Sequence, residues 1–310
     1  MKYRRLGDSE LQVSEICLGT WTTFGGSLPE ADARAVVDAA FEHGINFFDT
    51  ANVYSEGRSE EVLGRALASR PRDSYIVATK VFGTAPDGGR GLAREQILKQ
   101  IDASLERLGM DFVDLYQAHS YDDDVPVEEQ LAAFTEVVEA GKARYIGVSN
   151  WSGEQIRNAV ELAREHGYAK IVSSQPEYSL LERAPEEDVI PASRENGVSQ
   201  IVYSPLAQGV LTGKYAPGES AGEGTRAAAR SEWMELYNDE VLARVQRLRP
   251  VADGLGCSMA QLALAWILRE PNVASAIIGA SRPDQVADNT GASGLELDAE
   301  SLRAIDEAMS

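Results

Sequence analysis

NFFDTANVYSEG, residues 46–57, begins as an apolar strand and turns within a few residues into a polar loop that ends in glycine. Asp49 and Tyr54 lie at this transition. Packing gives no reason for a carboxylate and a phenol at the exit of a buried strand, whereas catalytic groups are often held on loops by a rigid scaffold. The stretch therefore directs attention to the ends of the other strands.

Apolar runs of strand length recur along the chain and alternate with segments of helical spacing, such as Ile97 to Leu108 followed by Gly109. Strands that alternate with crossover helices pair in parallel, and eight repeats favour a closed (β/α)8 barrel, the TIM barrel, over an open doubly wound sheet. No G-x-G-x-x-G follows any run, which also disfavours the open sheet. The expected strands are SEICLG (14–19), INFFDT (45–50), SYIVATK (74–80), FVDLYQAH (112–119), ARYIGVSN (143–150), KIVSSQ (170–175), SQIVYS (199–204) and VASAIIG (273–279).

We expect a single domain, residues 1–310, with three additions to the barrel. The opening KYRRLG to LQVSEI predicts a short β-hairpin that closes the bottom of the barrel. Residues 206–238 form a long, weakly periodic insertion, typical of a lid or binding loop, and its part 216–238 has no assigned role. Asp298 and the apolar positions after it predict an added C-terminal helix outside the barrel.

The composition excludes several classes of protein. The net charge of −20 disfavours a nucleic-acid partner, because phosphate binding needs a basic surface. The N-terminus has no signal-like apolar region, and no run approaches the ~20 apolar residues of a membrane span, so we expect a cytoplasmic chain without membrane insertion. Cys17 and Cys257 have no second thiol nearby and the histidines are scattered, so no metal site is expected. The acidity suits a salt-rich cytoplasm and ordinary solubility alike.

Four ionisable side chains lie at or just beyond consecutive strand ends: Asp49, Tyr54, Lys80 and His119. Strand ends of such barrels converge on the face that carries the chemistry. A buried Lys80 needs a charged partner, which Asp49 supplies, and its ammonium is expected to lower the pKa of Tyr54. Tyr54 then gives a proton to a carbonyl oxygen, while His119 hydrogen-bonds to that oxygen or relays the proton. Each residue alone suits a structural ion-pair network, but the four together favour catalysis.

No expected strand leads directly into a G-x-S-x-G nucleophile elbow, and the sequence has no zinc-binding H-E-x-x-H motif. A proton donor to a carbonyl then requires another group to attack the carbon, and hydride from a nicotinamide fits this need. The remaining strand ends offer amides, hydroxyls and an aromatic ring suited to holding a nicotinamide. These residues are Ser149, Asn150, Gln175 and Tyr203, and Ser204 follows Tyr203 at the same strand end.

Six segments resemble the aldo-keto reductase superfamily, in order and over essentially the whole chain. They are GTWTTFGG (19–26), INFFDTANVYSEGRSEEVLGRAL (45–67), VDLYQAH (113–119), GVSNWS (147–152), YSPLAQGVLTGKY (203–215) and IIGASRPDQVADN (277–289). Their amino-acid sequences are most similar to the branch of the voltage-gated potassium channel β-subunits and their bacterial relatives. The resemblance implies a TIM barrel with a catalytic tetrad of Asp49, Tyr54, Lys80 and His119.

The same resemblance implies NADP(H) as the cofactor, with the nicotinamide ring stacked on Tyr203. The family places the adenosine 2'-phosphate against Ser281 and Arg282. Arg282 also stands at the start of an expected helix, where a cation is unfavourable unless an anion binds beside it, so a positive pocket is expected there. The expected cofactor residues are Thr20, Trp21, Asp49, Ser149, Asn150, Gln175, Tyr203, Ser204, Leu206, Gly209, Lys214, Gly279, Ser281, Arg282, Gln285 and Asn289.

A small carbonyl compound is the expected substrate, in contact with Tyr54, His119 and two tryptophans, Trp21 and Trp151, that would wall an apolar pocket. Each tryptophan is equally compatible with packing in the core or at the rim. Two functions remain: an NADPH-dependent reductase of aldehydes and ketones, or a redox-sensing NADP(H)-binding accessory subunit of a channel or other partner. His119 favours the reductase, because the channel-type proteins carry Asn at this position. The sequence defines neither the physiological substrate nor the oligomeric state, and homo-oligomerisation stays open.

Overall fold

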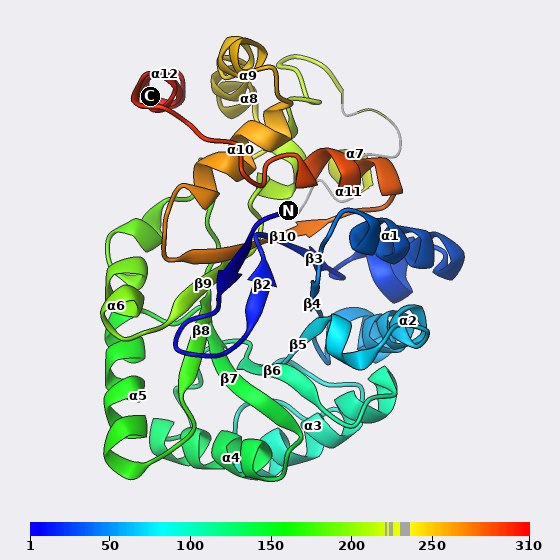
Figure 1. Cartoon of the computed structure of the whole chain (residues 1–310), viewed down its shortest axis with the longest axis vertical. Helices are drawn as coiled ribbons and strands as arrows, with labels where there is room; N and C mark the ends of the chain where they lie inside the picture. The colour runs from blue at the N-terminus through cyan, green and yellow to red at the C-terminus, as the bar shows by residue number, and fades with distance from the viewer. Residues whose placement is uncertain (221, 223–225, 230–235) are drawn as a thin grey trace.

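The computed structural model describes residues 1–220, 222, 226–229 and 236–310. Eight parallel strands close into a barrel in the order β10-β3-β4-β5-β6-β7-β8-β9, which confirms the predicted (β/α)8 fold (Figure 1). Each strand overlaps one of the expected apolar runs. The bounds are β3 Ile16–Gly19, β4 Phe47–Asp49, β5 Ile76–Val81, β6 Val113–Ala118, β7 Ala143–Ser149, β8 Ile171–Gln175, β9 Ser199–Val202 and β10 Val273–Gly279.

Helices surround the barrel as an outer ring (Figure 1). Local sequence fixes several of their ends: α3 stops at Gly109, whose φ of 63° suits glycine, and α5 and α10 start with capping boxes at Ser152 and Ser258. The helices are α1 Glu30–Glu42, α2 Arg58–Leu67, α3 Arg94–Leu108, α4 Val127–Glu139, α5 Gly153–His166, α6 Val189–Glu195, α7 Arg226–Ala229, α8 Asp239–Gln246, α9 Arg249–Leu255, α10 Met259–Leu268, α11 Pro283–Thr290 and α12 Ala299–Met309. Short helical turns are η1 Thr23–Ser27, η2 Tyr54–Gly57, η3 Arg72–Ser74, η4 Ala184–Glu186 and η5 Ala207–Thr212.

The N-terminal hairpin closes the bottom of the barrel, as predicted. Its strands β1 (Tyr3–Arg5) and β2 (Gln12–Ser14) pair antiparallel. Leu6, Leu11 and Val13 of the hairpin are buried in one apolar cluster with barrel residues that include Phe47 and Leu115. The hairpin and the lower part of the barrel therefore share an apolar interior.

The other two additions are also present. Asp298 caps α12, accepting a hydrogen bond from the backbone N–H of Ser301 at 2.8 Å, and α12 packs against α8 and α9. Within the insertion 206–238 the structure describes η5 and α7, whereas residues 221, 223–225 and 230–235 of this expected lid lie outside the described residues. β9 ends two residues earlier than expected, and Tyr203 extends it only as an isolated bridge to Glu177.

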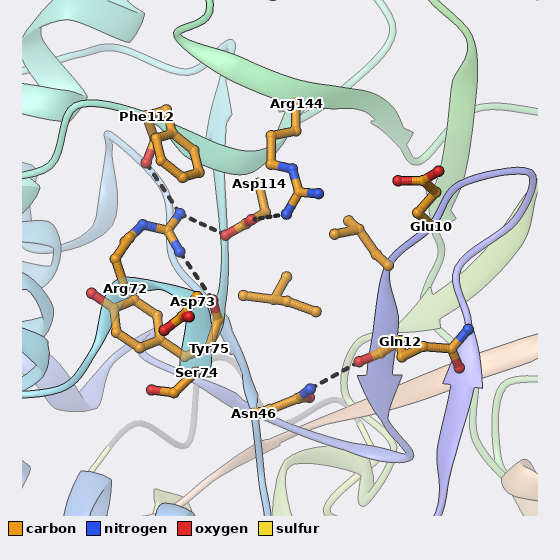
Figure 2. A pocket seen from close by; sticks show the side chains of 12 residues that line it. Glu10, Gln12, Asn46, Arg72, Asp73, Ser74, Tyr75, Phe112, Asp114 and Arg144 are labelled. Atoms are coloured by element: carbon orange, nitrogen blue, oxygen red, sulfur yellow. Dashed lines mark hydrogen bonds and ion pairs between the residues drawn. The ribbon is translucent and has the colours of Figure 1, made fainter.

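A hollow of about 390 Å³ lies at the N-terminal end of the barrel strands (Figure 2). Arg72 and Arg144 both reach the buried carboxylate of Asp114 there, at 2.6 and 3.2 Å. Arg72 also donates to the backbone oxygens of Tyr75 and Phe112. These contacts pair the charges with one another and connect neighbouring strands at their N-terminal ends. The hollow therefore lies at the opposite end of the barrel from the expected site.

Among the described residues, no single helix combines the length and apolar content that crossing a membrane requires. The pair formed by Asp239–Leu255 and Met259–Leu268, bent by 88°, meets those criteria only when both are taken together, by length and composition alone.

A buried ion pair ties α2 to the barrel and to α3. The fully buried Glu60 accepts hydrogen bonds from Thr79 Oγ1 (2.5 Å) and from Arg107 Nε (2.7 Å). Thr79 directly precedes Lys80 in β5, and α2 begins directly after the turn that starts at Tyr54. The pair therefore fixes both elements that flank the expected tetrad.

Arg107→Met should lower the free energy of unfolding by about 3–5 kcal/mol, because it leaves the Glu60 carboxylate buried without its cation. Chemical denaturation at neutral pH measures this loss. Arg65→Met is the matched control, since Arg65 and its partner Glu30 are both about half exposed and such pairs contribute little. Equal stability of the two variants would contradict the role given to Glu60.

Candidate active site

The structure brings the four expected tetrad residues together at the C-terminal end of the barrel. Asp49 is the last residue of β4, Lys80 lies near the end of β5, His119 directly follows β6, and Tyr54 opens the turn η2. Lys80 Nζ lies 2.5 Å from Asp49 Oδ1 and 3.1 Å from the Tyr54 hydroxyl. The Tyr54 hydroxyl lies 3.4 Å from His119 Nε2. The grouping inferred from strand ends is thus present in space.

Lys80 is fully buried, yet all three of its ammonium hydrogens have acceptors. Besides Asp49 and Tyr54, Nζ donates to the backbone oxygen of Thr50 at 2.8 Å. Burial is the largest single influence on the pKa of Lys80 and lowers it, but the charges and hydrogen bonds of Asp49 and Tyr54 together outweigh it and raise the pKa. Lys80 therefore stays an ammonium at neutral pH.

The pKa of Tyr54 corrects one sequence-based expectation. Burial raises this pKa above its ordinary value, and this effect exceeds the lowering caused by the Lys80 charge, while the Asp49 charge raises it further. The expectation was right that the Lys80 charge lowers the pKa of Tyr54. It was wrong about the net shift, because this pKa is raised overall. Because Asp49 compensates Lys80, the phenol experiences only part of the positive charge, and Tyr54 is protonated at neutral pH.

His119 is a neutral imidazole at neutral pH. Burial, and then the nearby Lys80 charge, lower its pKa to about 3. Its ring meets the ring of Tyr54 edge-on, with centroids 5.5 Å apart. Since Lys80 donates to the Tyr54 oxygen, the phenol's own proton is directed away from the lysine, towards His119 or a molecule in the barrel mouth.

The second carboxylate oxygen of Asp49 reveals a residue that the sequence analysis missed. Oδ2 accepts from Gln175 Nε2 at 3.0 Å and from Gln117 Nε2 at 3.5 Å. Gln117 lies two residues before His119, so strand alternation places both on the same face of β6. That alternation was the available signal.

The residues expected around a nicotinamide form a connected group. Ser149 Oγ donates to the backbone oxygen of Gln175 at 2.8 Å, and the Tyr203 hydroxyl donates to Asn150 Oδ1 at 3.0 Å. Asn150 Nδ2 approaches the backbone oxygen of His119 at 3.4 Å. Burial raises the pKa of Tyr203 to about 12, so its hydroxyl remains a donor.

The loop after β9 has a strained backbone. Ser204 and Gln208 adopt left-handed φ values of 50° and 57°, as Asn150 does after β7 (57°). Such conformations in residues other than glycine cluster at functional sites. Gly209 (φ 96°) lies against Lys214, because an added Cβ would meet Lys214 Nζ at 3.0 Å. Leu206 is partly buried against the core.

The residues expected at the 2'-phosphate lie where α11 begins. The backbone N–H of Ser281 donates to Gln285 Oε1 at 2.8 Å, and Asn289 is buried. Arg282 is exposed but pairs with Asp284, Nε to Oδ1 at 3.1 Å. An adjacent carboxylate therefore shares the arginine's charge, and the expected anion pocket stays a prediction. Gly279, at the end of β10, is exposed, and a Cβ there would meet nothing within 4 Å.

The two tryptophans lie in different environments. Trp21 is 41% exposed, so its expected contacts with substrate and cofactor remain predictions. Trp151 is only 3% exposed and packs edge-on against Tyr121, with ring centroids 4.9 Å apart, which favours a packing role over a pocket wall. Thr20 is buried and hydrogen-bonds through its hydroxyl to that of Thr50 at 3.0 Å. Within the described part of the chain, no cluster of His, Cys, Asp and Glu could hold a metal ion.

His119→Gln should reduce the loss of stability on acidification. The folded-state pKa of about 3 lies below the ordinary 6.5, so between these values the unfolded chain binds a proton that the folded chain does not, and stability falls as pH falls. From pH 7.5 to 5 this costs the parent about 2 kcal/mol through His119 alone. Denaturation of parent and variant at pH 7.5 and 5 measures it, and identical losses would contradict a neutral buried imidazole.

A closed barrel with a buried ion pair and a tyrosine hydroxyl grouped at its C-terminal face has the architecture in which barrel enzymes carry their chemistry. A sequence model of the aldo/keto reductase family matches residues 15–310. The chain belongs to the aldo/keto reductase family, and this membership supports an oxidoreductase activity.

Three curated relatives are similar over most of their length. A probable voltage-gated potassium channel subunit beta of Arabidopsis thaliana is 39% identical over 297 residues, and one of Oryza sativa subsp. japonica is 40% identical over 298; each match covers 93% of this chain and 90% of the relative. A putative voltage-gated potassium channel subunit beta of Schizosaccharomyces pombe is 38% identical over 319 residues, covering 99% and 93%. These names support the branch that the sequence segments resemble.

Proposed function

We propose that the chain is an NADPH-dependent reductase that converts aldehydes and ketones to alcohols, with Tyr54 as the proton donor. The contact that supports this most is the hydrogen bond from Lys80 Nζ to the Tyr54 hydroxyl at 3.1 Å. It leaves the phenol proton free for a carbonyl oxygen, and it stabilises the phenolate that remains after the proton has left.

Each tetrad residue has a distinct task in this proposal. Asp49 neutralises Lys80 in the buried site, so the ammonium is retained at low cost. Lys80 stabilises the developing charge on Tyr54. His119, neutral at physiological pH, offers a ring nitrogen near the same oxygen without adding a second charge. The carbonyl oxygen thereby meets a proton donor and a polar neighbour.

The residues present fit a bound dinucleotide phosphate. At one end, the amides of Asn150 and Gln175 provide donors and acceptors beside the tetrad; farther along, Lys214 and Arg282 supply cations. In sequence order, the strained backbone segments after β7 and β9 come between the tetrad residues and these two cations. When bound there, NADPH supplies the hydride that reduces the carbonyl carbon.

Tyr54→Phe should lower kcat for simple aromatic aldehydes by a factor of about 100 or more, because it removes the proton donor and keeps the ring. The affinity for NADPH, measured by fluorescence titration, should change little. Steady-state assays with a panel of aldehydes and ketones provide the measurement. Reduction by the variant at the parent rate would exclude Tyr54 as the acid.

Arg282→Ala should weaken NADPH binding by about tenfold or more and leave NADH binding nearly unchanged, since only NADPH carries the 2'-phosphate. Titration of both cofactors with both proteins gives the comparison. Arg303→Ala, a change of an exposed arginine on α12, is the matched control. If NADPH and NADH lose affinity equally, Arg282 does not read the phosphate.

The names of the relatives favour a second candidate, an accessory subunit whose bound NADP(H) biases a partner protein. The two candidates differ in turnover. A reductase consumes NADPH with carbonyl substrates in the absence of any partner, whereas an accessory subunit binds NADPH without appreciable turnover. The steady-state assay of the parent protein therefore distinguishes them.

A further inference from the structure

Asp49 is held on both sides inside the barrel. Its Oδ1 accepts from Lys80, whereas its Oδ2 accepts from the amides of Gln175 (3.0 Å) and Gln117 (3.5 Å). Gln117 is fully buried and Gln175 is 2% exposed. The position of the Lys80 ammonium therefore depends on what holds the far side of the carboxylate.

The strand register puts Gln117 in line with the tetrad. Gln117 pairs with Lys80 across β5 and β6, and with Gly147 across β6 and β7. A Cβ on Gly147 would overlap Ser173 Oγ and would lie 3.2 Å from Gln117 Cγ. The missing side chain at Gly147 thus gives Gln117 the room to lie beside the tetrad layer.

Packing alone does not explain a glutamine at this position. Its Oε1 is buried and has no hydrogen-bond partner among the described residues. Burying an unpaired amide oxygen costs free energy, and a methionine of similar length would avoid that cost. The amide orientation follows from Asp49, because the reverse orientation would turn Oε1 towards the carboxylate. What the glutamine provides is its N–H group for Asp49.

We propose that Gln117 is a positioning residue: its amide holds Asp49, and Asp49 in turn keeps Lys80 Nζ within hydrogen-bonding distance of the Tyr54 oxygen. The catalytic consequence rests on the proposed reductase function, whereas the effect on Tyr54 does not require bound cofactor or turnover. Two separate readouts therefore test the inference.

The first readout is NMR of the protein without cofactor, with tyrosine labelled with 13C at Cζ. The Tyr54 signal is assigned by its absence in Tyr54→Phe. Gln117→Met should shift this signal at pH 8 and move the onset of its ionisation about 0.5 pH unit or more upward, because the Asp49 charge is less compensated and Lys80 is less well held.

The matched control is Gln200→Met. Gln200 is also a fully buried glutamine of a barrel strand with an unpaired Oε1, but its amide donates to Asn272. The Gln200→Met change should therefore leave the Tyr54 signal unchanged. If Gln117→Met does not fold, Gln117→Asn replaces it, since the shorter side chain keeps the amide and loses its reach. An unchanged Tyr54 signal in a folded Gln117 variant would overturn the inference.

The second readout is turnover. Gln117→Met should lower kcat by about fivefold to tenfold, with KM and NADPH affinity within about twofold of the parent, and Gln200→Met should match the parent. Gln117→Glu should be worse than Gln117→Met, because a second carboxylate repels Asp49. A packing role predicts turnover close to the parent for Gln117→Met, since methionine has a similar length and leaves no amide oxygen unpaired. If the parent itself reduces no carbonyl compound, the reductase proposal fails and the Tyr54 signal alone decides on Gln117.

Discussion

The active-site architecture depends on one buried ion pair, formed by Lys80 and Asp49. An ammonium without any solvent exposure is tolerated only when its charge and all its hydrogens are satisfied, and here a carboxylate, a backbone carbonyl and a phenol do so. Pairing of β4 with β5 in parallel register brings these groups together. An open sheet could place the same strands side by side but would not surround the pair on every side.

The surroundings of this pair divide into an apolar part and a polar part. Below it, the hairpin and the lower strands form an apolar cluster that excludes water and strengthens the electrostatic interaction above. Beside it, the amides of Gln117 and Gln175 surround the carboxylate. Outside the barrel, Glu60 links α2, which follows the turn that carries Tyr54, to α3 and to β5, which carries Lys80.

Much of this was predictable from local sequence. Apolar runs gave the eight strands, and polar residues at their ends gave Asp49, Tyr54, Lys80 and His119. Quantities that depend on depth were not predictable: the net pKa direction of Tyr54 reflects the balance of burial against two opposite charges, and the 3% exposure of Trp151 reflects its packing on Tyr121. The amide contacts of Asp49 join strands far apart in the sequence, so no local pattern contains them.

The charge of the protein adds a constraint on any anionic ligand. With a net charge of −20, the surface repels a dinucleotide at long range, but at physiological salt such repulsion is screened beyond ~8 Å. Affinity must then come from short contacts, the role that we propose for Lys214 and Arg282. Arg282 is already paired with Asp284, and because both side chains are largely exposed the pair is weak. In the proposed NADP(H) complex, a doubly charged phosphate would compete for that guanidinium and a neutral ribose hydroxyl would not, so an exposed, pre-paired arginine is expected to discriminate between the two.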